Sequence, residues 1–261
     1  MMLCHSIDSD SLYNYFENKS WLIETKFDGL RASYCSLKNY LINRLGVNIT
    51  YKYPELFPLK RILVSDFILD GEIVVFKDNK SDFHSLSFRS HSQSSNRIRL
   101  LSSLYPVTFI AFDILKYEGI DLRNKPLIER KKILNEFKQF ENGYFKIIDY
   151  SFDKKQFIER ARQENQEGII LKNINSKYKD ERSFEWLKFK FFKEMTIRFT
   201  KYETNPDNSI TLESDSNIRV KCNDLRAVIV LEKQNYVKGV ISYLETEGYR
   251  KPRFPVLKKL V

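Results

Sequence analysis

Short runs of β-branched and aromatic residues recur between residues 20 and 192, and turn residues separate them. Such runs are typical of β-strands. Two helical patterns interrupt them, at residues 126–140, where Pro126 can open a helix, and at residues 153–166, where Asp153 is a candidate N-cap. This order of elements predicts an α+β fold built on antiparallel sheets. The expected strands are WLIE, LRASYCSL, FILDGEIVVF, VTFIAFDIL, EGIILK and EWLKFKFF.

The last part of the chain has a different pattern. From residue 193 it consists of short strand-like runs and turns, namely MTIRFTKYE, ITLES, IRVKC, RAVIVLE and VKGVISYLE. An all-β segment of this size suits a small closed barrel, and the OB-fold is a common solution. We therefore expect two domains, residues 1–191 and 192–261. The Ser-rich segment 90–97 is expected to be a surface loop without chemistry of its own.

The 261-residue chain is basic, with 44 Lys and Arg against 34 Asp and Glu and a formal net charge of +10. A positive balance favours polyanionic partners such as nucleic acid or nucleotides. No segment approaches the roughly 20 apolar residues of a membrane span, so we expect no membrane partner and a cytoplasmic location. Cys4, Cys35 and Cys222 are too few and too far apart for a disulfide framework or a zinc site.

The octet ETKFDGLR at residues 24–31 places a lysine, a carboxylate, a glycine and an arginine close together. Alone, a K-x-D-G pattern is a weak signal. Here further motifs follow it in order: NRLG at 43–46, LDGEIVVF at 69–76, FIAFDIL at 109–115, EGIILK at 167–172 and WLKFK at 186–190. Together they resemble the ordered motifs of the covalent nucleotidyltransferases, the superfamily of ATP-dependent DNA ligases, RNA ligases and mRNA capping enzymes.

The segment AFDILKYEGIDLRNKPLIERKKIL at 111–134 resembles small bacterial and viral ATP-dependent DNA ligases in particular. The resemblance implies a nucleotidyltransferase (adenylation) domain followed by an OB-fold domain, in a minimal two-domain enzyme of DNA repair, replication or recombination. It implies ATP as the nucleotide, Mg²⁺ or Mn²⁺ as the metal, and nicked duplex DNA as the partner. We expect a monomer in the cytoplasm of a bacterium or of a phage or viral host.

The family's nucleophile is the motif lysine, which matches Lys26. In the family this amine attacks the α-phosphorus of ATP, and the AMP then passes to the 5′-phosphate of a nick before the 3′-hydroxyl displaces it. An ordinary lysine is almost fully protonated at neutral pH, so nearby cations or burial must favour the neutral amine. Lys188 and Lys190 are two residues apart and project to one face of a strand, where they could hold the α-phosphate. These three lysines are the catalytic candidates.

The remaining motif residues are matched to the nucleotide pocket by the resemblance. It implies that Arg31 contacts phosphate or ribose, Glu72 the ribose hydroxyls, Phe112 the face of the base and Glu24 the adenine amino group. Glu167 is the candidate metal ligand. Lys172 closes the same motif with a less defined role. The nucleotide-binding candidates are Glu24, Thr25, Arg31, Arg44, Glu72, Phe112, Glu167, Lys188 and Lys190.

Contacts with DNA are less clearly marked. Arg44 matches a family arginine that contacts the 5′-phosphate at the break, and Arg89 in DFHSLSFR is a further candidate. The tail EGYRKPRFPVLKKL at 247–260 resembles the end of the family's barrel domain, but the Arg-x-Asp-Lys-like element that often follows is missing. In the family that element orients the leaving pyrophosphate, so self-adenylylation is expected to be less efficient unless Lys258 substitutes.

Two alternatives remain open on sequence alone. One is an RNA ligase, or a joiner of RNA/DNA hybrids, on the same scaffold. The other is a catalytically silent homologue that binds nucleic acid through its basic surface. The motifs favour DNA ligase over both.

Overall fold

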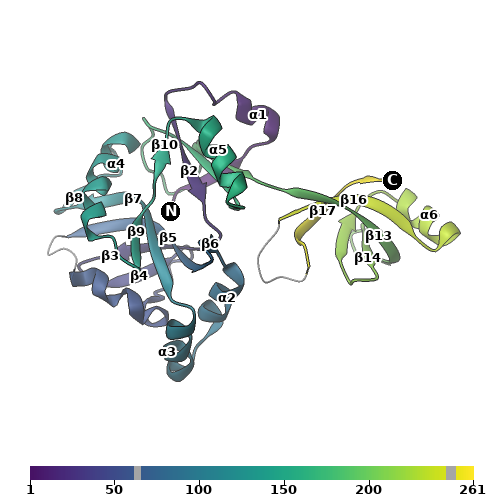
Figure 1. Ribbon diagram of the computed structural model, residues 1–261, viewed down its shortest axis with the longest axis horizontal. Coiled ribbons are helices and arrows are strands. Elements are labelled where there is room, and N and C mark those ends of the chain that lie inside the picture. Colours follow the sequence, from purple (N-terminus) through teal and green to yellow (C-terminus); the bar gives the residue numbers. More distant parts are fainter. Residues whose placement is uncertain (62–65, 245–250) are drawn as a thin grey trace. The chain divides into compact units, whose positions relative to one another are not determined.

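The structure is a computed structural model that describes residues 1–61, 66–244 and 251–261. The chain divides into two compact units, Met1–Lys190 and Phe191–Val261. The first unit is mixed α+β, and the second is an antiparallel, nearly closed five-stranded barrel of OB-like type (Figure 1). The predicted fold class is therefore confirmed.

One sheet of the first unit, here called sheet A, has the strand order β1-β12-β11-β2-β10. Only β1 and β12 run parallel, and the other neighbours are antiparallel. Three of these strands coincide with predicted runs, while β1 and β10 were not predicted. The strands are β1 Leu3–Ser6, β2 Trp21–Lys26, β10 Tyr150–Ser151, β11 Gly168–Asn173 and β12 Arg182–Lys190.

The other sheet of this unit, here called sheet B, has the order β4-β3-β5-β7-β8, with β6 paired to β5 and β9 paired to β7. Its long central strands β5 and β7 are almost wholly buried. The helix Phe83–His91 packs against β5, and the helix Leu127–Glu136 packs against β7. The main core lies here, around side chains such as Tyr53, Phe109 and Phe145. The strands are β3 Leu30–Cys35, β4 Tyr40–Asn43, β5 Phe67–Lys77, β6 Lys80–Ser81, β7 Val107–Tyr117, β8 Ile120–Asp121 and β9 Phe145–Ile147.

Both predicted helices are present. Asp153 caps α5 as expected, since its carboxylate accepts a hydrogen bond from the Gln156 N–H at 3.0 Å. The other pattern forms α4 and then a 3-10 turn, η3, with Pro126 just before the first helical residue. Among the helices that the structure describes, none is long and apolar enough to span a bilayer. The helical elements of this unit are α1 Ser9–Tyr13, η1 Thr50–Lys52, η2 Pro54–Arg61, α2 Phe83–His91, α3 Ser95–Leu104, α4 Leu127–Glu136, η3 Phe137–Phe140 and α5 Lys154–Gln163.

The prediction of a loop over residues 90–97 is wrong. This segment joins α2 and α3, which lie against each other at one end of the first unit, and only residues 92–94 fall outside the two helices (Figure 1). Asp82 caps α2 by accepting a hydrogen bond from the Ser85 N–H at 3.1 Å. Ile98 and Leu101 are the buried residues of α3 and lie on one side of it. The serines obscured this short amphipathic pattern, because Ser is equally common at helix ends and in loops.

The barrel of the second unit has the strand order β15-β14-β13-β16-β17, all antiparallel. Phe199, Leu212 and Ile241 are fully buried in its core. The first residues of the tail, 247–250, lie outside the described part of the chain. The elements are β13 Lys193–Thr204, β14 Ile210–Ser214, β15 Arg219–Cys222, α6 Arg226–Gln234, β16 Val237–Leu244 and β17 Arg253–Leu260.

One element of the barrel was predicted wrongly, since the run RAVIVLE forms the helix α6 and not a strand. Its β-branched residues favour a strand locally. However, Ala227 and Leu231, four residues apart, are the buried positions, and that spacing is helical. Asn235 ends the helix in the left-handed conformation, with φ 61°. Packing against the barrel therefore overrides the local strand preference.

Candidate active site

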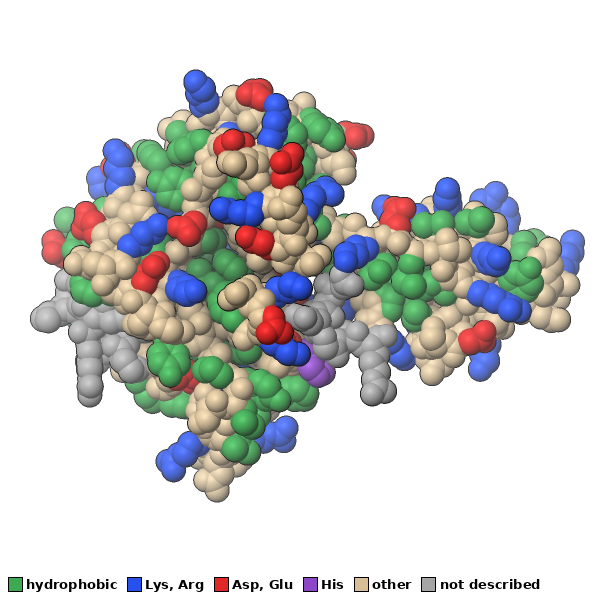
Figure 2. Space-filling model, viewed as in Figure 1, with side chains coloured by type: hydrophobic (Ala, Val, Ile, Leu, Met, Phe, Trp, Pro, Cys, Tyr) green, Lys and Arg blue, Asp and Glu red, His purple; other side chains and the backbone are tan. Residues whose placement is uncertain are grey.

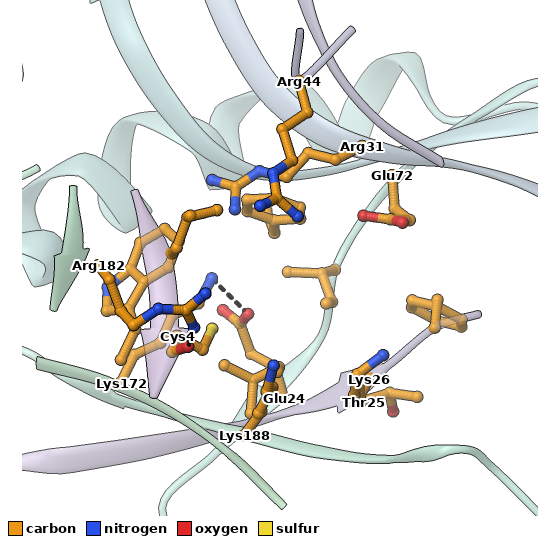
Figure 3. A pocket seen from close by; sticks show the side chains of 16 residues that line it. Cys4, Glu24, Thr25, Lys26, Arg31, Arg44, Glu72, Lys172, Arg182 and Lys188 are labelled. Atoms are coloured by element: carbon orange, nitrogen blue, oxygen red, sulfur yellow. Dashed lines mark hydrogen bonds and ion pairs between the residues drawn. The ribbon is translucent and has the colours of Figure 1, made fainter. Parts of the chain in front are cut away.

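A cavity of about 240 Å³ lies between sheet A and sheet B of the first unit. Arg31, Arg44 and Glu72 enter it from sheet B and the turn after β4, while Lys26 and Lys188 enter from sheet A (Figure 3). All the predicted site residues line this cavity except Lys190 and Glu167. The lining residues are Leu3, Cys4, Glu24, Thr25, Lys26, Phe27, Arg31, Arg44, Glu72, Phe112, Ile148, Ile170, Lys172, Arg182, Trp186 and Lys188.

Lys26 is the last residue of β2 and forms an ion pair with Glu167. The Glu167 carboxylate also pairs with Lys190, at 3.0 Å. The strand register explains this meeting, because Gly168 on β11 lies directly between Lys26 on β2 and Lys190 on β12. A Cβ atom at Gly168 would lie 2.1 Å from the Phe189 carbonyl oxygen. Glycine is thus required for the close strand approach that joins the two lysines through Glu167.

Lys188, like Arg182, is a cation of β12 that lines the cavity. Burial lowers the pKa of Lys188, and the positive charges of Arg182, Lys190 and Lys26 lower it further. These neighbours raise the local positive potential. The cavity is therefore suited to bind an anion such as a phosphate group.

Arg31 is held in place by a network of hydrogen bonds. Its Nε and Nη2 atoms donate to the two carboxylate oxygens of Asp70 at 3.0 and 2.6 Å, and Nη1 donates to the Met2 carbonyl oxygen at 2.5 Å. The Tyr178 hydroxyl donates to the same aspartate at 2.6 Å. The guanidinium group lies 5.0 Å from the centre of the Phe112 ring. Nη2 also donates to the Tyr178 hydroxyl at 3.4 Å. These bonds fix the orientation of Arg31 and leave one of its five N–H groups, on Nη1, for a ligand.

Glu72 lies opposite Arg31 in the ladder between β3 and β5. Burial raises the pKa of Glu72 to about 8, although the charges of Lys26 and Arg31 act in the opposite direction. Burial thus favours the protonated form of this carboxyl group in the free protein. A group of this kind can donate one hydrogen bond and accept others, which suits contact with hydroxyl groups.

The opposite end of the cavity carries aromatic side chains and a buried carboxylate. Phe112 on β7 packs edge-to-face on Trp186, with ring centres 6.1 Å apart. Lys172 lies 4.4 Å from the centre of the Phe112 ring. Its ammonium group pairs with Glu24 at 2.7 Å (Figure 3, dashed line), and Lys131 pairs with the other oxygen of that carboxylate. Burial alone would raise the pKa of Glu24, but the two lysines outweigh it and lower that pKa.

The family of the chain follows from a comparison with known families. The family described as ATP dependent DNA ligase domain matches residues 1–190. The chain belongs to the ATP-dependent DNA ligase family.

Two curated relatives of this ligase-family chain are similar over 66–72% of its length. The SPbeta prophage-derived DNA ligase-like protein LigB of Bacillus subtilis is 30% identical over 191 residues, 72% of this chain. A DNA ligase of Saccharolobus shibatae is 31% identical over 183 residues, 66% of this chain. The match spans 65% of the Bacillus protein and 30% of the Saccharolobus enzyme.

Solved structures support the fold of the ligase-family chain over both units. A structure from a study of DNA binding with a minimal scaffold in Lig E DNA ligases has a TM-score of 0.71 and is 16% identical, covering 100% of this chain and 98% of the other. Identity at this level shows the fold alone.

One predicted DNA contact of the ligase-family chain is wrong. Arg89 is 1% exposed, and its guanidinium group donates to the Glu55 carboxylate at 2.5 and 3.0 Å and to the carbonyl oxygens of Lys52 and Tyr105. These bonds connect α2 to the 3-10 segments around Lys52 and Glu55 and to Tyr105. The buried guanidinium group cannot reach a nucleic acid. A sequence shows that an arginine is present, but its burial depends on the tertiary fold.

Several residues that line the cavity or are buried near it were missed by sequence reasoning. Asp70 orients Arg31, while Asp113 and Arg130 form a buried ion pair at 2.8 Å. Arg182 and Cys4 line the cavity. An acidic residue within an apolar strand run, as in LDGE and FDIL, is a signal that could have identified the two aspartates, because buried carboxylates need a partner.

The described carboxylates do not form a metal site by themselves. Among the described residues, no group of three or more His, Cys, Asp or Glu side chains is arranged to hold one. Mg²⁺ is commonly bound by one or two carboxylates together with the phosphates of a substrate. Glu167, placed between Lys26 and Lys190, fits a site of that kind.

Proposed function

We propose that this chain is an ATP-dependent DNA ligase that seals nicks carrying a 3′-hydroxyl and a 5′-phosphate in duplex DNA. The intermediates would be a lysyl-AMP on Lys26 and then a DNA-adenylate. One observation supports this most strongly. Lys26 ends a strand at the edge of a cavity that has cations at one end and a buried carboxylate with aromatic rings at the other. Such a cavity suits a nucleoside triphosphate, with its phosphates near the lysine and its base near the rings.

In the first step the Lys26 amine attacks the α-phosphorus of ATP. A nitrogen–phosphorus bond forms, the bond from phosphorus to the bridging oxygen breaks, and pyrophosphate leaves. Lys188 and Arg44 bind phosphate oxygens, and Lys188 is placed to stabilise the charge that develops on the α-phosphate. The Lys26 ammonium group must lose a proton before it can attack, and the Glu167 carboxylate, its ion-pair partner, is placed to accept that proton.

The other cavity residues bind the nucleoside. Glu72 and Arg31 hold the ribose, Phe112 supports the base, and Glu24 and Thr25 lie at its edge. Glu167, with Lys190 beside it, would hold Mg²⁺ or Mn²⁺ together with phosphate oxygens. The metal would supply charge neutralisation on the phosphates when it is bound.

The later steps require a nicked duplex. We assign the adenylation chemistry to residues 1–191 and additional duplex contacts to the barrel, residues 192–261. The net charge of +10 favours a polyanion, and Lys and Arg predominate over acidic side chains on the visible face of the second unit (Figure 2). A monomer acting in the cytoplasm is the simplest form of this proposal.

Self-adenylylation tests the central step. Incubation with α-labelled ATP and Mg²⁺ should transfer label to the wild-type protein and to Lys155→Ala, which changes an exposed lysine paired with Glu17. Lys26→Ala should carry no label, because the nucleophile is lost. A wild-type protein that remains unlabelled, or label that persists in Lys26→Ala, would refute the proposed mechanism.

The choice of strand is tested separately. Sealing rates on nicked DNA, nicked RNA and RNA/DNA hybrid duplexes should be highest on DNA. A higher rate on RNA would identify an RNA ligase, and adenylylation without sealing of any duplex would rule out the proposed joining activity.

A further inference from the structure

Lys131 on α4 is a buried lysine to which the mechanism above gives no role. Its side chain is 1% exposed, and it forms an ion pair with Glu24. The Tyr150 ring centre lies 5.5 Å from its ammonium group. Burial lowers the pKa of Lys131 to about 8, against the opposing effect of Glu24. A buried charge is costly unless it is paired, and Glu24 is the carboxylate that pairs with Lys131.

Lys131 acts on a carboxylate that belongs to the nucleotide cavity. Glu24 is 1% exposed to solvent, yet it lines the cavity between the two sheets. Each of its two oxygens has one lysine partner, Lys131 on one side and Lys172 on the other at 2.7 Å. A carboxylate has about four acceptor positions. Glu24 can therefore accept further hydrogen bonds from a ligand while both lysines hold it.

The two lysines do not play equivalent roles. Lys172 lies 4.1 Å from the centre of the Trp186 ring and lines the cavity, so it touches the ligand space directly. Lys131 does not line the cavity. It approaches Glu24 from α4, which packs against β7 of sheet B, and can influence a ligand only through that carboxylate.

The ionisation of Glu24 determines which base it can bind. An ionised carboxylate only accepts hydrogen bonds, so it favours a 6-amino purine and repels a 6-oxo purine. A protonated carboxyl group also donates, and it would accept either base. Removing one of two cations from a fully buried carboxylate favours protonation.

We propose that Lys131 is a positioning residue for base specificity: it keeps Glu24 ionised and aimed at the 6-amino group of the nucleotide. This inference rests on the proposed function, because it needs a purine nucleotide in the cavity. Lys131 itself contacts neither the base nor the reacting atoms.

Arg130 supplies a matched control. It is the preceding residue of α4, it is 0% exposed, and its partner is Asp113 and not Glu24. Arg130→Met therefore removes a buried cation from the same helix without touching the carboxylate of the cavity. Any general loosening of α4 should appear in both variants.

The experiment compares ATP with two analogues, purine riboside triphosphate, which lacks the 6-amino group, and ITP, which has a 6-oxo group. The readout is kcat/KM for self-adenylylation by the full chain. Wild type should prefer ATP over each analogue by about 10-fold or more, the effect of one hydrogen bond to a charged group. In Lys131→Met both preferences should fall to within about threefold, while Arg130→Met should keep the wild-type ratios.

The possible results separate a failure of this inference from a failure of the proposed function. Wild-type ratios in an active Lys131→Met would overturn the inference, as would a wild type that does not discriminate at all. The second result requires no variant to fold. Loss of the preferences in Arg130→Met as well would also overturn it, since the effect would then be a general one. If wild type takes no label from any nucleotide, it is the proposed function that fails.

Discussion

At the scale of single residues, two glutamates of one cavity have pKa values that are shifted in opposite directions. Burial raises the pKa of Glu72 to about 8, and the positive charges of Lys26 and Arg31 offset only part of this effect. Glu24 is also buried, but direct ion pairs with Lys131 and Lys172 lower its pKa. The difference lies in direct contact, because a buried carboxyl group stays charged only when a cation is in contact with it. One end of the cavity is thus suited to hydroxyl groups and the other to an amino group.

The raised pKa of Glu72 predicts how stability depends on pH. An unfolded glutamate titrates near pH 4.3, so between about pH 4.5 and 8 the folded state binds the extra proton and the free energy of unfolding falls as pH rises. Glu72→Gln removes this dependence. The variant should match wild type near the lower end of this range and exceed it by about 2–4 kcal/mol at pH 9. Thermal melts across this range provide the measurement, and parallel pH profiles for the two proteins would contradict the assignment.

At the scale of elements, the close packing of β11 on its neighbours brings the catalytic candidates together. Gly168 is paired with Lys26 on one side and with Lys190 on the other. A side chain at this position has no space, because its Cβ would lie 2.9 Å from the Lys190 Cα. The glycine of EGIILK therefore has a physical role in the sheet, beside the carboxylate that precedes it.

Gly168→Ala should lower the free energy of unfolding by about 1–3 kcal/mol, since the added methyl group overpacks the sheet. It should also slow self-adenylylation, because Lys190 and Lys26 must move apart. Gly143→Ala is the matched control, as a methyl group added there would meet nothing within 4 Å. Chemical denaturation and labelling with ATP would measure both effects, and equal behaviour of the two variants would show that the contact is not tight.

The N-cap of α5 allows a second test at this scale. Asp153→Ala removes the acceptor for the Gln156 N–H and should cost about 1 kcal/mol of stability. Asp153→Asn retains an oxygen at the same place and should cost much less. Urea unfolding of both variants distinguishes a lost cap from a lost charge, and a similar cost in both would point to the charge.

At the scale of the whole molecule, charge is the property that the two units share. The chain carries +10, and each unit has its own hydrophobic core. Several exposed cations are already paired, such as Lys138 with Asp149 and Arg123 with Asp121. Exposed pairs contribute little to stability, and the cations in excess of such pairs fit the polyanionic partner proposed above.

Binding of a nicked duplex should weaken steeply with salt. Between about 50 and 200 mM monovalent salt the affinity should fall by about 100-fold or more, because phosphate contacts release bound counterions. Self-adenylylation with ATP should change far less over this range, since no polyelectrolyte takes part. Filter binding with sealed and nicked duplexes would measure the slope, and an affinity independent of salt would contradict a basic DNA-binding surface.

Local sequence was sufficient for much of the fold. The runs that became β2, β3, β5 and β7 were predicted because alternating or continuous apolar residues lie between turns. Asp153 was identified as a cap because a short acceptor precedes an amphipathic pattern. The run RAVIVLE was predicted wrongly because its residues prefer a strand while its buried positions have helical spacing, and only packing against the barrel resolves that conflict.

The sequence by itself determined the order of the motifs, and with it the chemical types available to the site: a lysine proposed as the nucleophile, two strand lysines and several carboxylates. Only the tertiary structure decided which groups meet. It placed Arg89 in the interior, joined Lys26 to Lys190 through Glu167, and set Lys131 behind Glu24. The physical reason is that burial and charge pairing depend on strand register and on contacts between residues distant in the chain, which no local pattern encodes.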